Sequence, residues 1–354
     1  MKALIAMSGG VDSSVAAFLM KDYERVGCTM RLFDNDDADE EYTNTCCSKD
    51  DVEDARAVCS RMGIPYYVFN FKDDFEEKIV RKFIDSYRSG ITPNPCIDCN
   101  RYMKFDKLFD RALALGCELI VTGHYARVEE KDGKYLLKKA VDLSKDQSYV
   151  LYSLTQEQLS HIRFPLGGYT KDEARRIAEE NGFVNAAKPD SQDICFVPDG
   201  DYAAFIERRG CAPEPGDFVS VGGELLGRHK GITHYTIGQR KHLGISVGAP
   251  IYVVRINPED NTVVLGDESE LFGVTAHVTD FNWIGGEAPS QPIRCRAKTR
   301  YRQTEQPAVA TVNPDGSVTV TFDEPVRAIT PGQACVLYDG DVVLGGGVIR
   351  YPLT

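Results

Sequence analysis

Residues 2–14 read Lys2-Ala3-Leu4-Ile5-Ala6-Met7-Ser8-Gly9-Gly10-Val11-Asp12-Ser13-Ser14. The apolar run Lys2–Met7 is typical of a buried strand, and the apolar spacing over Asp12–Lys21 predicts a helix. Two glycines allow a tight turn between them, whose backbone N–H groups converge on an anion at the start of the helix. The stretch therefore predicts a phosphate-binding turn between the first strand and the first helix of an α/β sheet.

The side chains of this turn suit a nucleotide. Ser8, Ser13 and Ser14 add hydroxyl donors, and Asp12 is a candidate ligand for a magnesium ion that bridges phosphates. The turn lacks the G-x-x-x-x-G-K-[ST] pattern, which excludes the ordinary P-loop that transfers a γ-phosphate. A glycine-rich turn without a ligand is the alternative, but three hydroxyls and one carboxylate favour phosphate binding.

Predicted strands and helices alternate through the first half of the chain. This alternation is typical of a doubly wound parallel sheet, in which ligands bind beyond the carboxyl ends of the strands. Met30 and Gly123, near the ends of the second and fourth strands, are therefore expected to flank an adenosine. The further strands are expected at Val26–Phe33, Tyr66–Phe71 and Glu118–Thr122, and the helices at Ser48–Met62 with Ser48 as N-cap, Asp74–Tyr87, Tyr102–Leu115 and Thr170–Asn181 with a capping box from Thr170 to Glu173.

After about Val197 the pattern changes to short alternating segments separated by glycine and proline. Such segments favour a small β-barrel or sandwich, with a hairpin turn at 313–316. We therefore expect a catalytic domain at 1–198, a small central domain at 199–268 and a C-terminal β-barrel-like domain at 269–354. The expected strands are Phe218–Val221, Ile251–Ile256, Thr262–Gly266, Ile293–Tyr301, Ala308–Val312, Ser317–Phe322 and Ala334–Tyr338.

The composition narrows the class of protein. With 42% hydrophobic and 27% charged residues among 354, the chain is expected to fold into a globular core. No run approaches about 18 consecutive apolar residues, so no transmembrane helix is expected. The start of the chain lacks a signal-peptide pattern, which makes the cytosol the expected location. The net charge of −12 counts against indiscriminate nucleic-acid binding but permits a local basic surface.

Eleven cysteines without an export signal argue against a disulfide framework. Cys96 and Cys99 stand in the run 94–101, which is expected to form a loop before a helix, where nearby cations lower a thiol pKa. A C-x-x-C pair in such a protein also suits redox work or metal binding. Cys195 offers a third thiol, with a buried structural cysteine as the alternative. Cys46-Cys47 is interpreted as a pair of surface thiols.

A basic stripe is predicted near the end of the chain. Its five cations alternate along one expected strand, so they would project from one face. Like charges in register repel one another, and phosphate binding is the better account. Further cations stand upstream, at 228–230 and 240–241. The stripe consists of Arg294, Arg296, Lys298, Arg300 and Arg302.

These motifs resemble the bacterial tRNA-specific 2-thiouridylases, and the SGGxDS turn resembles the PP-loop of ATP pyrophosphatases. The matching stretches are 6–14, 94–105, 122–127, 145–151 and 189–196, with further matches at 231–241, 298–302 and 331–334. They follow one another along essentially the whole chain. The resemblance implies that the C2 carbonyl oxygen of wobble uridine 34 is adenylated, and that a persulfide sulfur then displaces AMP to give 2-thiouridine.

The resemblance also implies roles for individual residues. The family's first catalytic cysteine precedes an asparagine, which matches Cys99, and the second matches Cys195. Cys195 would carry the persulfide, and Cys99 would resolve it as a disulfide. Implied in ATP binding are Ala6, Met7, Ser8, Gly9, Gly10, Val11, Asp12, Ser13, Ser14, Met30 and Gly123. Implied in tRNA binding are Asn94, Pro95, Cys96, His124, Lys145, Asp146, Gln147, Arg300, Tyr301 and Gln333; for His124 a packed loop histidine is the alternative.

The implied cofactor is ATP with Mg²⁺, for which Asp12 is the candidate ligand. Position 96 is often Asp in the family, and with Cys96 present an iron–sulfur cluster on Cys96, Cys99 and Cys195 is an open alternative. The implied partners are the anticodon stem-loop of a tRNA and a cysteine desulfurase or sulfur-relay protein as persulfide donor, without a membrane. The Pro-, Asp- and Gly-rich run 189–200 predicts a mobile loop around Cys195.

Two other functions remain open at this stage. One is a PP-loop enzyme that adenylates a small molecule, which would need neither the basic stripe nor the two cysteines. The other is a cysteine-based metal or sulfur carrier, which leaves the turn at 8–14 unexplained. ATP/pyrophosphate exchange, measured with and without tRNA, would separate these alternatives.

Overall fold

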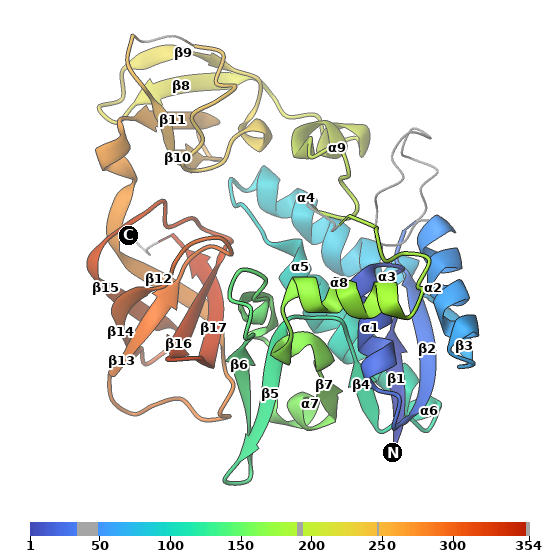
Figure 1. Cartoon of the computed structure of the whole chain (residues 1–354). Helices are drawn as coiled ribbons and strands as arrows, with labels where there is room; N and C mark the ends of the chain where they lie inside the picture. Colours follow the sequence, from blue (N-terminus) through green and yellow to red (C-terminus); the bar gives the residue numbers. More distant parts are fainter. Residues whose placement is uncertain (34–48, 190–193, 246–247, 352–354) are drawn as a thin grey trace.

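The computed structural model describes residues 1–33, 49–189, 194–245 and 248–351. The predicted N-cap Ser48, the pair Cys46-Cys47 and residues 190–193 of the predicted loop lie outside the described residues. Figure 1 shows three parts of the chain: a sheet with flanking helices from the first half, four strands above, and a barrel below them. Within the described residues, no helix is long and apolar enough to cross a membrane.

The first half forms a parallel sheet of five strands in the order β3-β2-β1-β4-β7. Apolar residues alternate between its two faces along β1. Ala3 and Ile5 pack with α1, α2 and α8, whereas Leu4 packs with the helices of residues 72–114 on the other side. The doubly wound sheet is thus confirmed. The bounds are β1 Lys2–Ala6, α1 Val11–Leu19, β2 Glu24–Arg31, α2 Lys49–Arg61, β3 Tyr66–Asn70, β4 Leu119–Val121, β7 Ile162–Arg163 and α8 Lys171–Glu180.

A helical run begins at Pro95, earlier than the predicted Tyr102. Asn94 caps it, because its side chain accepts a hydrogen bond from the backbone N–H of Cys96 at 3.2 Å, and proline suits the first helical position. The prediction of a loop around Cys96 and Cys99 is therefore wrong. The run consists of α5 Pro95–Asp98, η3 Cys99–Lys107 and α6 Leu108–Ala114, and a similar run precedes it as α3 Lys72–Phe75, η2 Glu76–Val80 and α4 Arg81–Arg88.

The capping box at the start of α8 is confirmed, with reciprocal hydrogen bonds between Thr170 and Glu173. A second box, from Thr155 to Gln158, begins a short helix that the sequence pattern did not indicate. The remaining short elements are η4 Ser148–Leu151, α7 Gln156–His161, η5 Pro165–Gly168 and α9 Tyr202–Arg208.

The central part is a four-stranded sheet in the order β10-β11-β8-β9. Phe218 is fully buried in its own apolar cluster, separate from the core of the parallel sheet. The elements are β8 Gly216–Ser220, β9 Leu225–His229, η6 Ile232–His234, β10 Tyr252–Asn257, β11 Thr262–Gly266 and η7 Glu268–Leu271.

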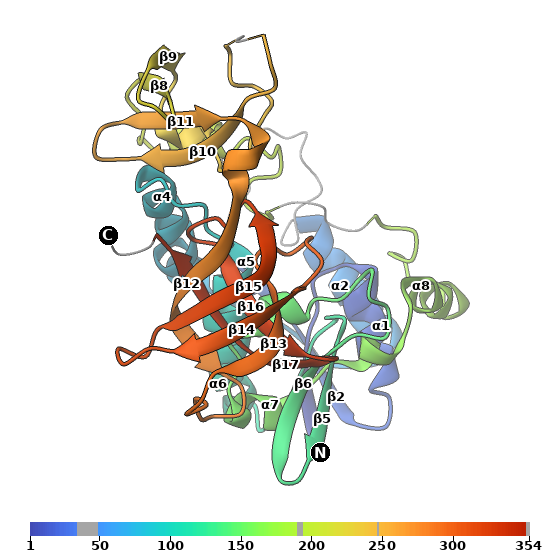
Figure 2. The same ribbon diagram turned by 90° about the vertical axis from the view of Figure 1, so that its left-hand side faces the viewer.

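The last six strands form a barrel that closes where β12 pairs with β17. The predicted hairpin at 313–316 is confirmed, with Gly316 at a φ of +82°. The hairpin of β5 and β6, which the sequence analysis missed, extends this sheet because β6 pairs with β17, as Figure 2 shows. The elements are β5 Ala126–Lys131, β6 Lys134–Lys139, β12 Phe272–Trp283, β13 Ile293–Lys298, β14 Gln306–Val312, β15 Val318–Arg327, β16 Ala334–Asp339 and β17 Val342–Arg350.

Candidate active site

The turn between β1 and α1 is held in shape by its own hydroxyls. Ser13 Oγ donates to the carbonyl of Gly10 at 2.9 Å and accepts from the backbone N–H of Ser8 at 3.1 Å. The N-cap residue of α1 is Gly10, which has no side chain that could cap the first backbone N–H groups of the helix. A helix start of this kind attracts anions. The geometry of the turn is therefore compatible with the predicted phosphate binding.

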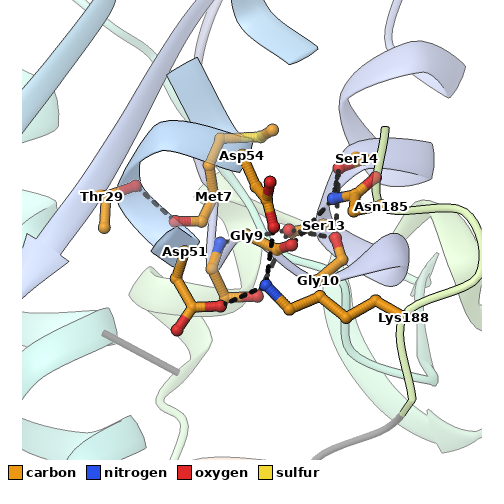
Figure 3. A network of polar contacts seen from close by, with 11 residues as sticks. Met7, Gly9, Gly10, Ser13, Ser14, Thr29, Asp51, Asp54, Asn185 and Lys188 are labelled. Atoms are coloured by element: carbon orange, nitrogen blue, oxygen red, sulfur yellow. Dashed lines mark hydrogen bonds and ion pairs between the residues drawn. The ribbon is translucent and has the colours of Figure 1, made fainter. Parts of the chain in front are cut away.

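Close backbone contacts make two glycines necessary here. Gly9 has a φ of +74°, and a Cβ added to it would lie 2.5 Å from the carbonyl oxygen of Asp51. A Cβ added to Gly123, just beyond β4, would lie 2.8 Å from the backbone nitrogen of Ser13. The end of β2 is joined to the same turn, because Thr29 Oγ1 donates to the carbonyl of Met7 at 2.7 Å (Figure 3). Three strand ends thus meet at the phosphate turn.

A cavity of about 350 Å³ opens beside this junction. It brings together segments that lie far apart in the sequence, because the carboxyl ends of β1, β2 and β4 share one edge of the sheet. Of the residues expected to bind ATP or to act as catalytic thiols, its wall contains Ala6, Met7, Ser8, Asp12, Ser13, Met30, Gly123, Cys99 and Cys195, together with Pro95, Cys96, His124 and Gln147 from the expected tRNA contacts.

A larger hollow of about 900 Å³ shares Ser8, Asp12 and Gln147 with this cavity. Its wall adds Lys145, Asp146 and Tyr301 to the residues already brought together. Lys298 lies there between two rings, with Nζ 5.7 Å from the centroid of Tyr149 and 5.6 Å from that of Tyr301. The hollow therefore connects the phosphate turn to a cationic and aromatic surface.

Asp12 is held by side chains that the sequence analysis did not consider. Its carboxylate accepts two hydrogen bonds from Lys171 Nζ, both at 2.8 Å, and one from the hydroxyl of Tyr125 at 2.8 Å. Among the described residues, no three His, Cys, Asp or Glu side chains are grouped to hold a metal ion. This finding gives no support to an iron–sulfur cluster on Cys96, Cys99 and Cys195.

His124 is buried at the wall of the cavity. Its Nδ1 lies 2.7 Å from Thr122 Oγ1, and its Nε2 lies 3.5 Å from Lys104 Nζ. Burial and, after it, the charge of Lys104 lower the pKa of His124 well below its usual value. The imidazole is therefore neutral near pH 7, and it acts as a hydrogen-bonding group rather than as a cation.

The predicted basic stripe is correct only for Arg294, Arg296 and Lys298, which alternate along β13. β13 ends at Lys298, so Arg300 and Arg302 do not continue the strand. Arg294 pairs with Asp323, and Arg296 Nε lies 3.6 Å from Glu305 Oε1. The like charges that would have needed an external partner are largely compensated within the barrel.

Arg300 and Gln333 hold parts of the molecule together. Arg300 donates to the carbonyl of Ile237 at 2.8 Å and to the hydroxyl of Thr330, and burial lowers its pKa. Gln333 Nε2 donates to the carbonyls of Thr92 and Pro93 at 2.9 and 3.3 Å, just before the cap of the Cys99 helix. Neither residue lines the two hollows described above. Their contacts are between domains.

The sequence analysis missed a second group of polar residues around the turn. Asn185 Nδ2 donates to the carbonyl of Gly9 at 2.8 Å and to Ser14 Oγ at 2.9 Å, and Lys188 Nζ contacts Asp51 and Asp54, both at 2.7 Å (Figure 3). No local motif signals these contacts, since 137 positions separate Asp51 from Lys188.

The parallel sheet and its SGGxDS turn define a nucleotide-binding α/β protein of the PP-loop class. Three family models match successive parts of the chain: a tRNA methyl transferase HUP domain over residues 1–199, a tRNA methyl transferase PRC-barrel domain over 203–267, and an aminomethyltransferase beta-barrel domain over 255–349.

Similar proteins are known across the full length. The chain is 51% identical to a protein of Acetivibrio thermocellus, with 99% of each chain covered, and 50% identical to one of Clostridioides difficile, again with 99% of each covered. Both relatives are named tRNA-specific 2-thiouridylase MnmA. The chain belongs to the family of tRNA-specific 2-thiouridylases.

Proposed function

We propose that this protein is an ATP-dependent tRNA sulfurtransferase that converts wobble uridine 34 to 2-thiouridine. The relatives' names point to this activity, and one observation of the site carries it. Cys99 and Cys195 line the same cavity as Ser8, Asp12 and Ser13 of the phosphate turn. An activated carbonyl and an attacking sulfur have to meet in one place, which this cavity provides.

The reaction has three displacements. The C2 oxygen of the uridine attacks the α-phosphorus of ATP, and pyrophosphate leaves. The terminal sulfur of a Cys195 persulfide then attacks C2, and AMP leaves with the original oxygen. The Cys99 thiolate attacks Cys195 Sγ, which releases 2-thiouridine and forms a Cys99–Cys195 disulfide. An external thiol has to reduce this disulfide before the next cycle.

The phosphate turn binds and orients the triphosphate in this scheme. Gly9 and Gly10 let the backbone approach the phosphates, and the start of α1 stabilises the charge that develops on pyrophosphate. The adenosine lies between Met30 and Gly123, at the ends of β2 and β4. Mg²⁺ bound with ATP would neutralise phosphate charge. Asp12, which belongs to the phosphate turn, is the carboxylate that would bind this ion.

The substrate is the anticodon stem-loop of a tRNA, whose target base has to leave the stack to reach the cavity. We place the base next to Pro95 and Cys96, and the flanking backbone along the larger hollow. The persulfide comes from a cysteine desulfurase or a sulfur-relay protein. The remaining proposed tRNA contacts are Asn94, His124, Lys145, Asp146, Gln147 and Tyr301, with residues 199–268 and 269–354 as the domains that hold the tRNA. Arg300 and Gln333 instead make contacts within the protein.

The test is a single-turnover assay with ATP, Mg²⁺, a persulfide donor and a tRNA that carries U34. The expected product is 2-thiouridine at position 34, identified by the mass of the nucleoside, with a U34→C tRNA as control. A methylated nucleoside, as the names of the matched models would suggest, would contradict the proposal. ATP/pyrophosphate exchange that proceeds equally without tRNA would favour a small-molecule substrate, and no exchange at all would favour a sulfur or metal carrier.

A further inference from the structure

The thiol of Cys195 is anchored on its C-terminal side by the apolar core. Phe196 packs edge-to-face on Phe75 and Phe83, with ring centroids 5.6 and 5.3 Å apart, and Val197 is fully buried. These contacts involve helices on the face of the sheet opposite α1 and α2.

The N-terminal side of the same segment is anchored on the phosphate turn itself. Asn185 is 3% exposed and donates to the carbonyl of Gly9 and to Ser14 Oγ. Three positions later, Lys188 places its ammonium between two carboxylates of α2, Asp51 and Asp54 (Figure 3). Both anchoring side chains come from the chain between α8 and Cys195.

Asp51 connects Lys188 to the phosphate turn. Its side chain is 5% exposed, and its backbone lies against Gly9, where a Cβ would come within 2.6 Å of the Asp51 Cα. Although burial alone lowers the pKa of Lys188, hydrogen bonds to the two carboxylates raise it above its usual value, so the ammonium stays charged. Lys188, Asp51 and Gly9 therefore form one contiguous contact.

The position of Lys188 limits where the thiol lies. Lys188 and Cys195 are seven positions apart, and an extended chain spans at most about 3.3–3.6 Å per residue, or about 25 Å in total. Lys188 also borders the larger hollow together with Ser8, Gly10 and Asp12. The root of the thiol-bearing segment thus lies where phosphates are expected.

We propose that Asn185 and Lys188 are positioning residues for Cys195, which fix the root of its segment to the phosphate turn so that nucleotide binding aligns the thiol with the activated base. The role rests on the function proposed above for Cys195. In this proposal, the ion pairs of Lys188 with Asp51 and Asp54 serve the sulfur-transfer step and not the adenylation step.

The experiment compares the full-length wild type with Lys188→Met, Lys188→Arg and the matched control Lys107→Met. Lys107 also forms one ion pair at 2.8 Å, with Asp74, but borders neither hollow. The first readout is the rate at which iodoacetamide alkylates Cys195, followed by peptide mass spectrometry with and without Mg²⁺ and α,β-methylene-ATP. The second is a pair of single-turnover rates, for pyrophosphate release in the adenylation step and for thiouridine formation.

We expect the analogue to change the alkylation rate of Cys195 in the wild type, in Lys188→Arg and in Lys107→Met, but not in Lys188→Met, with analogue affinity the same in all four. Thiouridine formation by Lys188→Met should fall by roughly 10- to 100-fold, the cost of a misplaced reacting group, while pyrophosphate release continues at the wild-type rate. If Lys188→Met does not fold, Asp54→Asn, which keeps Asp51, can replace it. We expect this variant to keep the rate of adenylation and to lose a smaller part of the rate of thiouridine formation.

Three results would overturn the positioning role: alkylation that ignores the nucleotide in the wild type, alkylation that still responds to it in Lys188→Met, or equal losses of analogue affinity, pyrophosphate release and thiouridine formation. The last would make Lys188 a phosphate ligand. Failure of the proposed function looks different. In that case the wild type forms no thiouridine, while the nucleotide-dependent alkylation and its loss in Lys188→Met persist.

Discussion

At the scale of single residues, the site depends on polar contacts between distant parts of the chain. Asp12 accepts hydrogen bonds from Tyr125 and Lys171, which lie 113 and 159 positions further along. Lys171 is 7% exposed, so its charge is largely removed from water and depends on this carboxylate. The aspartate of the phosphate turn therefore has a structural contact as well as a proposed role toward the nucleotide.

Asp12→Ala should abolish AMP formation and lower the free energy of unfolding by about 1–3 kcal/mol, since hydrogen bonds from a charged donor are lost. In the double variant with Lys171→Met, stability should recover in part while AMP formation stays absent. Affinity for tRNA should remain close to that of the wild type, because the proposed tRNA contacts come mainly from other parts of the chain. Loss of tRNA binding in parallel with AMP formation would contradict this account of Asp12.

His124 predicts how stability depends on pH. Its pKa is lowered well below 6.5 in the folded protein, so below pH 6.5 the unfolded chain binds a proton that the folded chain does not. The free energy of unfolding should therefore fall with falling pH, by at most about 1.4 kcal/mol per pH unit. Denaturant unfolding between pH 7.5 and 5 should show a shallower slope for His124→Gln than for the wild type and for His161→Gln. Equal slopes in all three proteins would show that His124 is not buried in its neutral form.

At the scale of elements, the helical run that starts at Pro95 places both cysteines of the first motif. Cys96 and Cys99 are one turn apart, so they lie on neighbouring positions of the same face, and both line the cavity. Cys96 is exposed, whereas Cys99 is partly buried. The two thiols differ in environment although they share a motif.

Substitution of single cysteines separates the persulfide mechanism from the cluster alternative. Cys99→Ser and Cys195→Ser should each stop thiouridine formation and still consume ATP with release of pyrophosphate, since adenylation precedes the attack by sulfur. Cys96→Ser should keep substantial activity, because the persulfide mechanism gives it no sulfur to transfer. An inactive Cys96→Ser variant, together with an iron absorption band in anaerobically purified protein, would show that the three thiols hold a cluster.

The sequence predicts those elements whose signal is local. The strand, turn and helix at residues 2–19 and the capping box at Thr170 need only nearby residues. The hairpin of β5 and β6 was missed because its charged residues hide the apolar alternation, as in Glu129-Glu130-Lys131. The prediction of a basic stripe is wrong beyond Lys298, because the alternation of cations alone does not reveal that the strand ends there. The contacts of Lys188 with Asp51 and Asp54 arise only from the packing of α2 beside the turn.

At the scale of the whole molecule, the barrel is joined to the first half of the chain by a shared apolar cluster, by the pairing of β6 with β17 and by polar contacts. Gln333 reaches the backbone before the Cys99 helix, and Arg101 donates to Asp280 of β12 at 2.6 Å. Arg300 connects the barrel to the central strands. A tRNA bound across these parts would therefore meet a surface whose domains are already oriented.

Arg300 and Arg302 should respond differently to neutralisation. Arg300→Gln should lower the free energy of unfolding by about 1.5–3 kcal/mol, because its buried charged hydrogen bonds are lost. Arg302, which is exposed at the larger hollow, should instead weaken tRNA binding when changed to Gln and reduce the salt dependence by about one phosphate contact. Thermal unfolding and salt titrations of tRNA affinity measure both effects. A weaker salt dependence of tRNA affinity in Arg300→Gln, with unchanged stability, would show that Arg300 contacts tRNA and is not a structural residue.

The central claim is that the uridine oxygen is transferred to AMP before sulfur replaces it. The most direct measurement uses a tRNA whose U34 carries ¹⁸O at C2, in one turnover with ATP and a persulfide donor. The mass of the AMP should then increase by one ¹⁸O for each 2-thiouridine formed. Unlabelled AMP alongside 2-thiouridine would show that ATP is hydrolysed by water and that the carbonyl is not adenylated, which would contradict the mechanism.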